Sequence, residues 1–339
     1  MHVLITGGAG FIGSHVAQLH LARGDKVHVV DDLSTGNRAN IHLLEGFPNF
    51  RFDHADMLVW DGLERAAAWA DRIYHLAAVV GVYRVIAEPT RVLATNIAAC
   101  ERLLRAVTAS GWKPHVVIAS SSEVYGHRLE SELHEQMDLS VSTRAGTRWN
   151  YSVSKIADEA LGLSYAQKFD IPTVIARLFN TTGPRQTGRY GMVVPRFVEQ
   201  AVKGEEITVY GDGVQTRSFC DVRDTARALD MLAAKATAEG LVVNVGNDRE
   251  ISVNDLAEMV RARAHSTSPI KHVPYVTAYG EDFEDIRRRR PVLDRLRALT
   301  GFKHEHTLED TLDELIRTSR AKLSKEDGHG HRSVVCHQS

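Results

Sequence analysis

Tyr151 and Lys155, in the stretch YSVSK, are the residues whose types and spacing most directly suggest chemistry. Four residues apart on a helix, their side chains stack on one face. A free tyrosine has a pKa of about 10 and is a poor base at neutral pH. A neighbouring ammonium group favours the phenolate and lowers that pKa. The pair therefore predicts a general base, although this spacing alone is common by chance.

A second polar group is the stretch ASSSEVYG at 119–126, which follows the apolar run HVVI at 115–118. A buried strand that ends in three serines and a glutamate is either a loop without chemistry or a site at the carboxyl end of a parallel sheet. A serine hydroxyl can share the proton of a reacting hydroxyl and hold a developing carbonyl. Ser121, Ser122 and Glu123 are the catalytic candidates, whereas Ser120 equally suits a cap on the strand-end backbone.

A glycine-rich turn, TGGAGFIG at 6–13, lies between the first predicted strand and a helix. Glycine lets the backbone approach a pyrophosphate, and the helix N-terminus offers it free N–H groups. The second strand ends in Asp31 and Asp32, where a carboxylate binds the adenosine ribose and repels a 2′-phosphate. The sequence therefore predicts NAD as cofactor and disfavours NADP, although the nearby Arg38 keeps NADP open.

Further cofactor contacts are predicted along the same edge. Asp56 suits the adenine amino group, and HLAA at 75–78 ends a strand in small residues. Asn96 lies in a predicted helix, where a structural role is the alternative. The candidate cofactor-binding residues are Gly7, Gly10, Phe11, Ile12, Gly13, Asp31, Asp32, Ser34, Thr35, Gly36, Asp56, Met57, Leu76, Ala77, Ala78, Asn96, Tyr151 and Lys155.

Apolar runs that alternate with amphipathic stretches must position these residues. Strands are predicted at 2–6, 26–31, 72–77, 115–120, 173–178 and 241–246, and helices at 12–23, 92–110 and 152–169. This alternation predicts an α/β fold with a Rossmann-type doubly wound parallel sheet. We expect an NAD-binding domain at 1–180 with a strand from 241–247, and a smaller, discontinuous α/β substrate-binding domain at 181–240 and 248–320. The polar tail 321–339 is predicted to be poorly ordered.

The composition limits the class of protein. Of 339 residues, 43% are apolar and 25% charged, which is ordinary for a globular enzyme. The net charge of −2 gives no general attraction to nucleic acid or an anionic membrane. No apolar run approaches the length of a membrane helix, and the N-terminus begins with a strand pattern rather than a signal peptide. The cysteines match no disulfide or metal spacing, so we expect no metal and a cytoplasmic location.

Together the glycine turn, Asp31, Ser121 and the Tyr151/Lys155 pair resemble the extended short-chain dehydrogenases/reductases, in their nucleotide-sugar epimerase, dehydratase and decarboxylase group. The resemblance covers about residues 1–318. It implies that Tyr151 is the base, Lys155 its electrostatic partner and Ser121 a hydroxyl pointing at the reacting sugar. It also implies a homodimer joined through the helices at 92–110 and 152–169.

The resemblance extends to the substrate-binding part of the family, between residues 177 and 219. It implies that Asn180 binds the diphosphate sugar, that Val194 and Tyr210 flank the nucleobase, and that Arg217 pairs with the diphosphate. Arg185 either meets a sugar carboxylate or braces a loop. Galactose epimerases carry a further phosphate-binding arginine where this chain is acidic, at 279–285, and Arg289 is the expected replacement. The implied partner is a UDP-sugar.

The family shares oxidation of the sugar at C4, after which three reactions diverge. The 4-keto sugar can be reduced on the other face, can lose carbon dioxide if C5 carries a carboxylate, or can eliminate water. Similar dehydratases use Thr-Asp-Glu, and the missing Asp disfavours dehydration here. Uronate decarboxylases use Thr-Ser-Glu and an RKP motif, close to Ser121–Glu123 and RRRP at 288–291. The sequence favours 4-epimerisation of a UDP-hexose or UDP-hexuronate, keeps UDP-glucuronate decarboxylation as the alternative, and leaves a non-enzymatic NAD-binding regulator as the remote one.

Overall fold

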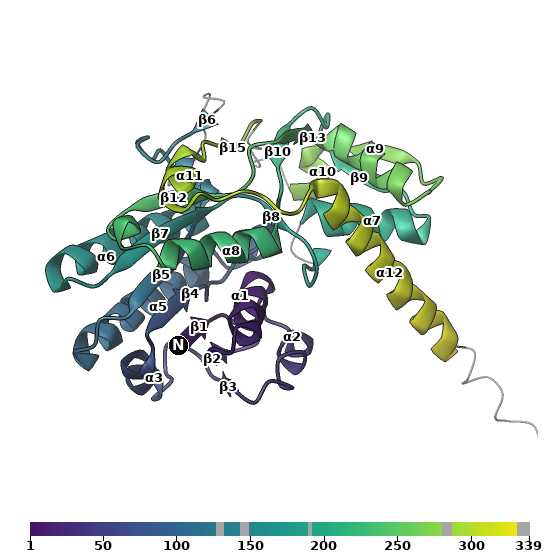
Figure 1. The fold of residues 1–339 in the computed structure, drawn as a ribbon. Coiled ribbons are helices and arrows are strands. Elements are labelled where there is room, and N and C mark those ends of the chain that lie inside the picture. Colours follow the sequence, from purple (N-terminus) through teal and green to yellow (C-terminus); the bar gives the residue numbers. More distant parts are fainter. Residues whose placement is uncertain (127–131, 143–148, 189–191, 280–286, 331–339) are drawn as a thin grey trace, which may run out of the picture.

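A computed structural model of the chain describes residues 1–126, 132–142, 149–188, 192–279 and 287–330. Its centre is a parallel sheet of seven strands in the order β12-β7-β5-β4-β1-β2-β3 (Figure 1). The strands are β1 (His2–Thr6), β2 (Lys26–Asp31), β3 (Phe50–His54), β4 (Arg72–His75), β5 (His115–Ser121), β7 (Thr173–Leu178) and β12 (Val242–Val245). The predicted doubly wound parallel sheet is confirmed.

The burial of each strand explains which ones the sequence reveals. The inner strands β1, β5 and β7 are buried along almost their whole length, as parallel strands covered on both faces are. Their apolar runs therefore stand out. The edge strand β3 is only partly buried, carries charged residues and was absent from the prediction.

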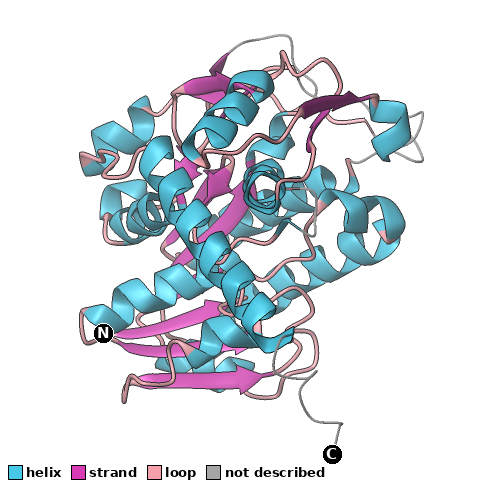
Figure 2. Ribbon diagram, turned by 90° about the vertical axis from the view of Figure 1, so that its right-hand side faces the viewer, coloured by secondary structure: helices cyan, strands magenta, loops and turns pink. Residues whose placement is uncertain are grey.

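Helices cover both faces of the sheet (Figure 2). One face carries α3 (Leu63–Trp69), α5 (Pro89–Ser110) and α6 (Asn150–Phe169), with α5 packed along α6. The other face carries α1 (Phe11–Ala22), α8 (Val222–Ala233) and α11 (Asp294–Thr300). Short helices α2 (Arg38–His42) and α4 (Val82–Ala87) lie in the connections after β2 and β4.

A second, smaller core is built from the C-terminal half of the chain. The helices α7 (Val193–Lys203), α9 (Val253–Arg263) and α12 (Leu308–Gly330) pack together, away from α3, α5 and α6 (Figure 1). Short strands pair beside them or near the strand ends of the sheet: β9 (Ile207–Tyr210) with β14 (Ile270–Val273), β10 (Thr216–Ser218) with β13 (Glu250–Ser252), β8 (Thr181–Thr182) with β11 (Cys220–Asp221), and β6 (Glu132–Leu133) with β15 (Arg290–Pro291). The single-turn pieces are η1 (Ser122–Tyr125), η3 (Ala236–Ala238) and α10 (Tyr275–Tyr279).

Two helices from the ranges predicted as the substrate-binding domain pack on the central sheet. The helices α8 and α11 fall within 181–240 and 248–320, yet they pack on the sheet beside α1 and β12. In addition, α12 continues to Gly330, ten residues into the range predicted as a tail, while 331–339 and most of the acidic stretch 279–285 lie outside the described residues. Among the described residues, no helix combines the length and apolarity that crossing a membrane requires.

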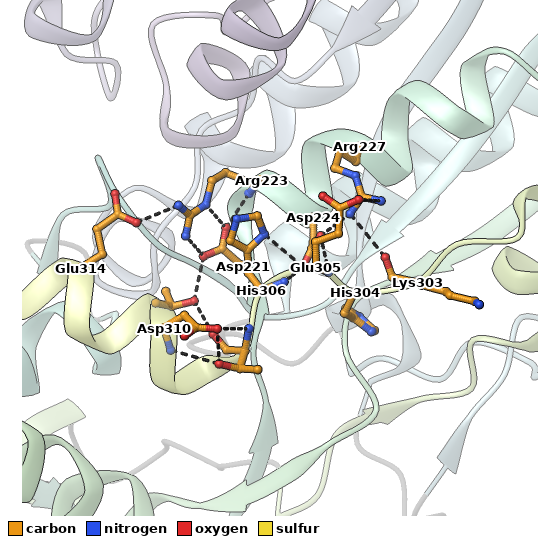
Figure 3. A network of polar contacts seen from close by, with 12 residues as sticks. Asp221, Arg223, Asp224, Arg227, Lys303, His304, Glu305, His306, Asp310 and Glu314 are labelled. Carbon is orange, nitrogen blue, oxygen red and sulfur yellow. Dashed lines mark hydrogen bonds and ion pairs between the residues drawn. The ribbon is translucent and has the colours of Figure 1, made fainter.

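A polar network ties the second core to the sheet (Figure 3). Asp221 caps α8, receives a 2.7 Å hydrogen bond from Thr311 on α12, and pairs with Arg223. Asp224, fully buried, accepts the backbone N–H groups of Glu305 and His306 at 3.1 and 3.0 Å. Since α8 packs on the sheet, these carboxylates fix the segment before α12 relative to the sheet.

Candidate active site

The glycine turn forms a cradle that has no room for side chains. Gly7 has a φ of +72°, and a Cβ on it would lie 2.6 Å from the backbone nitrogen of Ala77. A Cβ on Gly13 would lie 2.4 Å from the carbonyl oxygen of Gly7. Gly10 caps α1 without a side chain, and Phe11 and Ile12 begin the helix. The turn and the helix N-terminus thus suit a pyrophosphate.

Asp31 lies beside this cradle at the end of β2. Its carboxylate accepts the backbone N–H groups of Ala9 at 3.0 Å and Leu33 at 2.8 Å. Burial raises the pKa of Asp31, and these hydrogen bonds oppose that rise. Gly36 packs against the same carboxylate, where a Cβ would approach within 2.6 Å. The nearby Arg38 pairs with Glu45 and lies over the ring of Phe52, so it already has partners in the protein.

The other predicted cofactor residues divide into turn formers and packing residues. Asp32, exposed, accepts the N–H of Ser34 at 2.9 Å, and Asp56, also exposed, accepts the N–H of Leu58 at 2.8 Å. Asn96 is buried and hydrogen-bonds both backbone groups of Val79, which holds the connection after β4. Direct contacts of all these residues with a cofactor stay predictions. The remaining candidates lie on the same edge: Thr35 in the turn after β2, Met57 after β3, and Leu76, Ala77 and Ala78 after β4.

Three catalytic candidates converge where β5 ends and α6 begins. Ser121 is the last residue of β5, accepts the N–H of Glu123 at 3.2 Å, and lies close enough to Tyr151 to lower the pKa of its phenol. Tyr151 lies in the first turn of α6, and Lys155 follows one turn later with 2% of its side chain exposed. A reacting hydroxyl placed between Ser121 and Tyr151 would therefore meet a proton acceptor and a hydrogen-bond donor together.

The pKa of Tyr151 is raised in the structure, whereas the neighbouring Lys155 predicts a lowered one. Burial raises the pKa of its phenol, and this outweighs the lowering caused by the Lys155 ammonium and the Ser121 hydrogen bond. Burial lowers the pKa of Lys155, but Asp158 and Tyr151 together raise it above its ordinary value, so Lys155 stays charged. The cationic ring of bound NAD would add a second positive charge that favours the phenolate.

Ser120 makes a structural contact, although with a side chain rather than with the strand-end backbone. Its hydroxyl donates to Glu159 at 2.5 Å, and Glu159 receives two further hydrogen bonds from Arg177 at 2.9 and 2.7 Å. The Arg177 guanidinium lies 4.7 Å from the ring centre of Tyr125, whose hydroxyl donates to Asn244 at 2.7 Å. This buried chain of contacts braces β5, α6, β7 and β12 behind the catalytic residues.

Arg289, from a distant part of the sequence, lies beside the residues that follow the carboxyl end of β5. It immediately precedes β15, its side chain is 7% exposed, and its Nη1 lies 3.4 Å from Ser122 Oγ and 3.8 Å from Glu123 Oε1. Both contacts are to the residues that directly follow Ser121. A buried guanidinium here presents a fixed positive charge beside the catalytic group.

The remaining substrate candidates have other partners in the structure. Asn180 donates to the carbonyl of Ser218 at 3.2 Å, and Arg217 donates to that of Thr216 at 2.7 Å. Tyr210 ends β9 and stacks under the Arg196 guanidinium at 3.9 Å. Val194 is buried in the second core, so only its backbone can flank a base. Arg185 hydrogen-bonds Gln18 on α1, which matches the bracing alternative.

Comparison with known proteins identifies the group. The pattern of the NAD dependent epimerase/dehydratase family matches residues 3–246. The chain belongs to this family. UDP-N-acetyl-alpha-D-glucosaminuronate decarboxylase of Bacillus cytotoxicus is 34% identical over 94% of this chain and 97% of its own length. UDP-glucuronic acid decarboxylase 2 of Arabidopsis thaliana is 32% identical over 99% of this chain and 72% of its own.

Solved structures of family members have the same fold. UDP-N-acetylglucosamine 4-epimerase of Methanobrevibacter ruminantium matches with a TM-score of 0.85 and 29% identity over 95% of this chain and 98% of its own. UDP-glucuronic acid 4-epimerase of Bacillus cereus, solved with UDP-glucuronic acid and NAD, matches with a TM-score of 0.84 and 27% identity over 95% and 100%. The predicted family, the class of NAD-dependent nucleotide-sugar enzyme and the cofactor NAD are confirmed.

Proposed function

We propose that this enzyme decarboxylates a UDP-hexuronic acid after oxidising it at C4. The observation that carries the proposal is the buried Arg289 beside Ser122 and Glu123, next to the catalytic Ser121 and Tyr151. A fixed cation at that point suits a substrate that bears a carboxylate on C5. The sequence favours 4-epimerisation, but the position of Arg289 and the decarboxylase relatives support the alternative.

The first step uses the group at the end of β5. Tyr151, as phenolate, takes the proton of the C4 hydroxyl, and Ser121 donates a hydrogen bond to the same oxygen as it becomes a carbonyl. Lys155 supplies the positive charge that stabilises the phenolate. Bound NAD supplies the acceptor for the hydride that leaves C4.

The second step follows from the chemistry of the product. A C4 ketone makes the C5 carboxylate a β-keto acid, so the bond from C5 to the carboxyl carbon breaks and carbon dioxide leaves. Its electron pair forms an enolate whose charge lies on the C4 oxygen, where Ser121 and the now protonated Tyr151 donate hydrogen bonds. A proton is then added to C5, and we assign its delivery to a protonated Glu123, which is left as a carboxylate beside Arg289.

A second candidate, 4-epimerisation of a UDP-hexuronate, uses the same carboxylate contact. The similarity to a UDP-glucuronic acid 4-epimerase supports it. The two reactions separate by product: UDP-glucuronate, UDP-N-acetylglucosaminuronate and UDP-glucose are each incubated with the pure protein and NAD, then analysed by mass spectrometry and proton NMR. Loss of the mass of carbon dioxide from a uronate supports decarboxylation. An isobaric product with an inverted C4 signal refutes it and supports epimerisation.

A further inference from the structure

Asp158, which follows Lys155 by three residues on α6, makes a buried contact with the catalytic lysine. Its Oδ2 accepts a hydrogen bond from Lys155 Nζ at 3.0 Å, and the two side chains are 0% and 2% exposed. The spacing of three residues places Asp158 on the same helix face as Lys155 and Tyr151. The sequence motif that contains Tyr151 and Lys155 does not include Asp158.

The contact restricts the ammonium group. A buried ion pair is held firmly because losing either partner leaves an uncompensated charge. An ammonium has three donors, so with one directed at Asp158 the other two point elsewhere in a defined geometry. Burial raises the pKa of this carboxyl, whereas Lys155 and the nearby Cys100 thiol on α5 lower it.

The same carboxylate opposes the effect of Lys155 on the base. Lys155 lowers the pKa of Tyr151, whereas Glu123 and Asp158 raise it. The charged and titratable groups around these residues come from every element packed there: Lys155 and Glu159 on α6, Cys100 and Glu101 on α5, His75 at the end of β4, Glu123 on η1 and Arg289 beside it.

We propose that Asp158 is a positioning residue that fixes the Lys155 ammonium and, by partly cancelling its charge, sets the pH at which Tyr151 becomes a base. The proposal rests on the roles proposed for Tyr151 and Lys155 but not on the fate of the 4-keto sugar. Without the carboxylate, the Tyr151 phenolate replaces Asp158 as counter-ion of the buried ammonium, so the phenolate forms at lower pH.

The test is a near-ultraviolet absorbance titration of the NAD-saturated protein, with the titration of Tyr151→Phe subtracted to isolate one phenolate. Asp158→Asn removes the charge and keeps the size, and Asp158→Glu keeps the charge. Glu159→Gln is the matched control, because it neutralises the adjacent buried carboxylate, which faces Ser120 and Arg177 instead.

We expect Asp158→Asn to move the midpoint to lower pH, while Asp158→Glu and Glu159→Gln keep the wild-type midpoint even if Glu159→Gln melts earlier. We also expect Asp158→Asn to lower kcat about 10- to 100-fold through the misplaced ammonium. An unchanged or higher midpoint in Asp158→Asn, or an equal shift in Glu159→Gln, overturns the proposal. The titration needs no turnover, so an enzyme that leaves every uronate unchanged would refute the proposed reaction alone.

Discussion

Replacing Arg289 by methionine separates recognition of a carboxylate from recognition of the diphosphate. Methionine fills similar space without charge, and Arg288→Met is a matched control from the same basic run. Arg288 is 47% exposed and pairs with Glu250, whereas Arg289 is 7% exposed and lies against Ser122 and Glu123. Only the Arg289 change therefore alters the charge at the catalytic edge.

The burial of Arg289 sets the size of the effect. Truncating one partner of a buried, hydrogen-bonded charge pair costs about 2–5 kcal/mol. At about 1.4 kcal/mol per tenfold, this corresponds to a loss of roughly 30- to several-thousand-fold in affinity. An exposed pair such as Arg288–Glu250 contributes about 0–1 kcal/mol, so Arg288→Met should change affinity less than about fivefold.

The assay is calorimetric binding of UDP-glucuronate and of UDP-glucose, which differ at C6 alone. We expect Arg289→Met to weaken the binding of UDP-glucuronate by roughly 30- to several-thousand-fold. The affinity for UDP-glucose should change by less than about threefold, as it does when an exposed contact is lost. If the affinities for both ligands fall equally, Arg289 binds the diphosphate, as the resemblance implies, and does not recognise the sugar carboxylate. If neither weakens, Arg289 has no part in recognition.

Three further predictions concern the base, the cofactor edge and pH. Tyr151→Phe should lower kcat about 10²- to 10⁴-fold while NAD still binds, measured by turnover and by fluorescence quenching; full turnover would remove Tyr151 from the mechanism. Asp31→Ala loses two backbone hydrogen bonds and should raise the KM for NAD and lower Tm more than the exposed Asp32→Ala does; equal effects would contradict the role of Asp31. Burial lowers the pKa of His15 to about 4 and that of His75 to about 3, below the ordinary value of about 6.5, so the folded state takes up these protons less readily than the unfolded state. The two histidines therefore cost no folding free energy well above pH 6.5, and they destabilise the fold increasingly as the pH drops toward 4. His75→Asn should reduce the fall in Tm between these values. An unchanged slope would exclude His75 as a cause.

The sequence predicted best what depends on local patterns. Glycine at positions 7 and 13 follows from the tight turn, and the buried runs of β1, β5 and β7 follow from a sheet covered on both faces. The edge strand β3 was missed because its partial burial leaves no apolar run. The packing of α8 on the sheet was missed because it depends on contacts distant in sequence.

Contacts distant in the sequence also explain what the site prediction lacked. The resemblance implied a diphosphate contact for Arg289, and no local signal in the sequence shows that Arg289 lies against Glu123, 166 residues earlier. Glu159 and Arg177 were not singled out, although a buried carboxylate and a buried arginine in neighbouring elements must pair. Asp158 could have been found from its spacing to Lys155 on one helix face.

Decarboxylation is tested by the product that the enzyme forms from UDP-glucuronate or UDP-N-acetylglucosaminuronate in the presence of NAD. Carbon dioxide release is measured against nucleotide sugar consumed, in the wild type and in Tyr151→Phe. We predict one carbon dioxide per sugar consumed in the wild type and none in the variant. Sugar conversion with its carboxylate retained would contradict decarboxylation and assign the enzyme to 4-epimerisation.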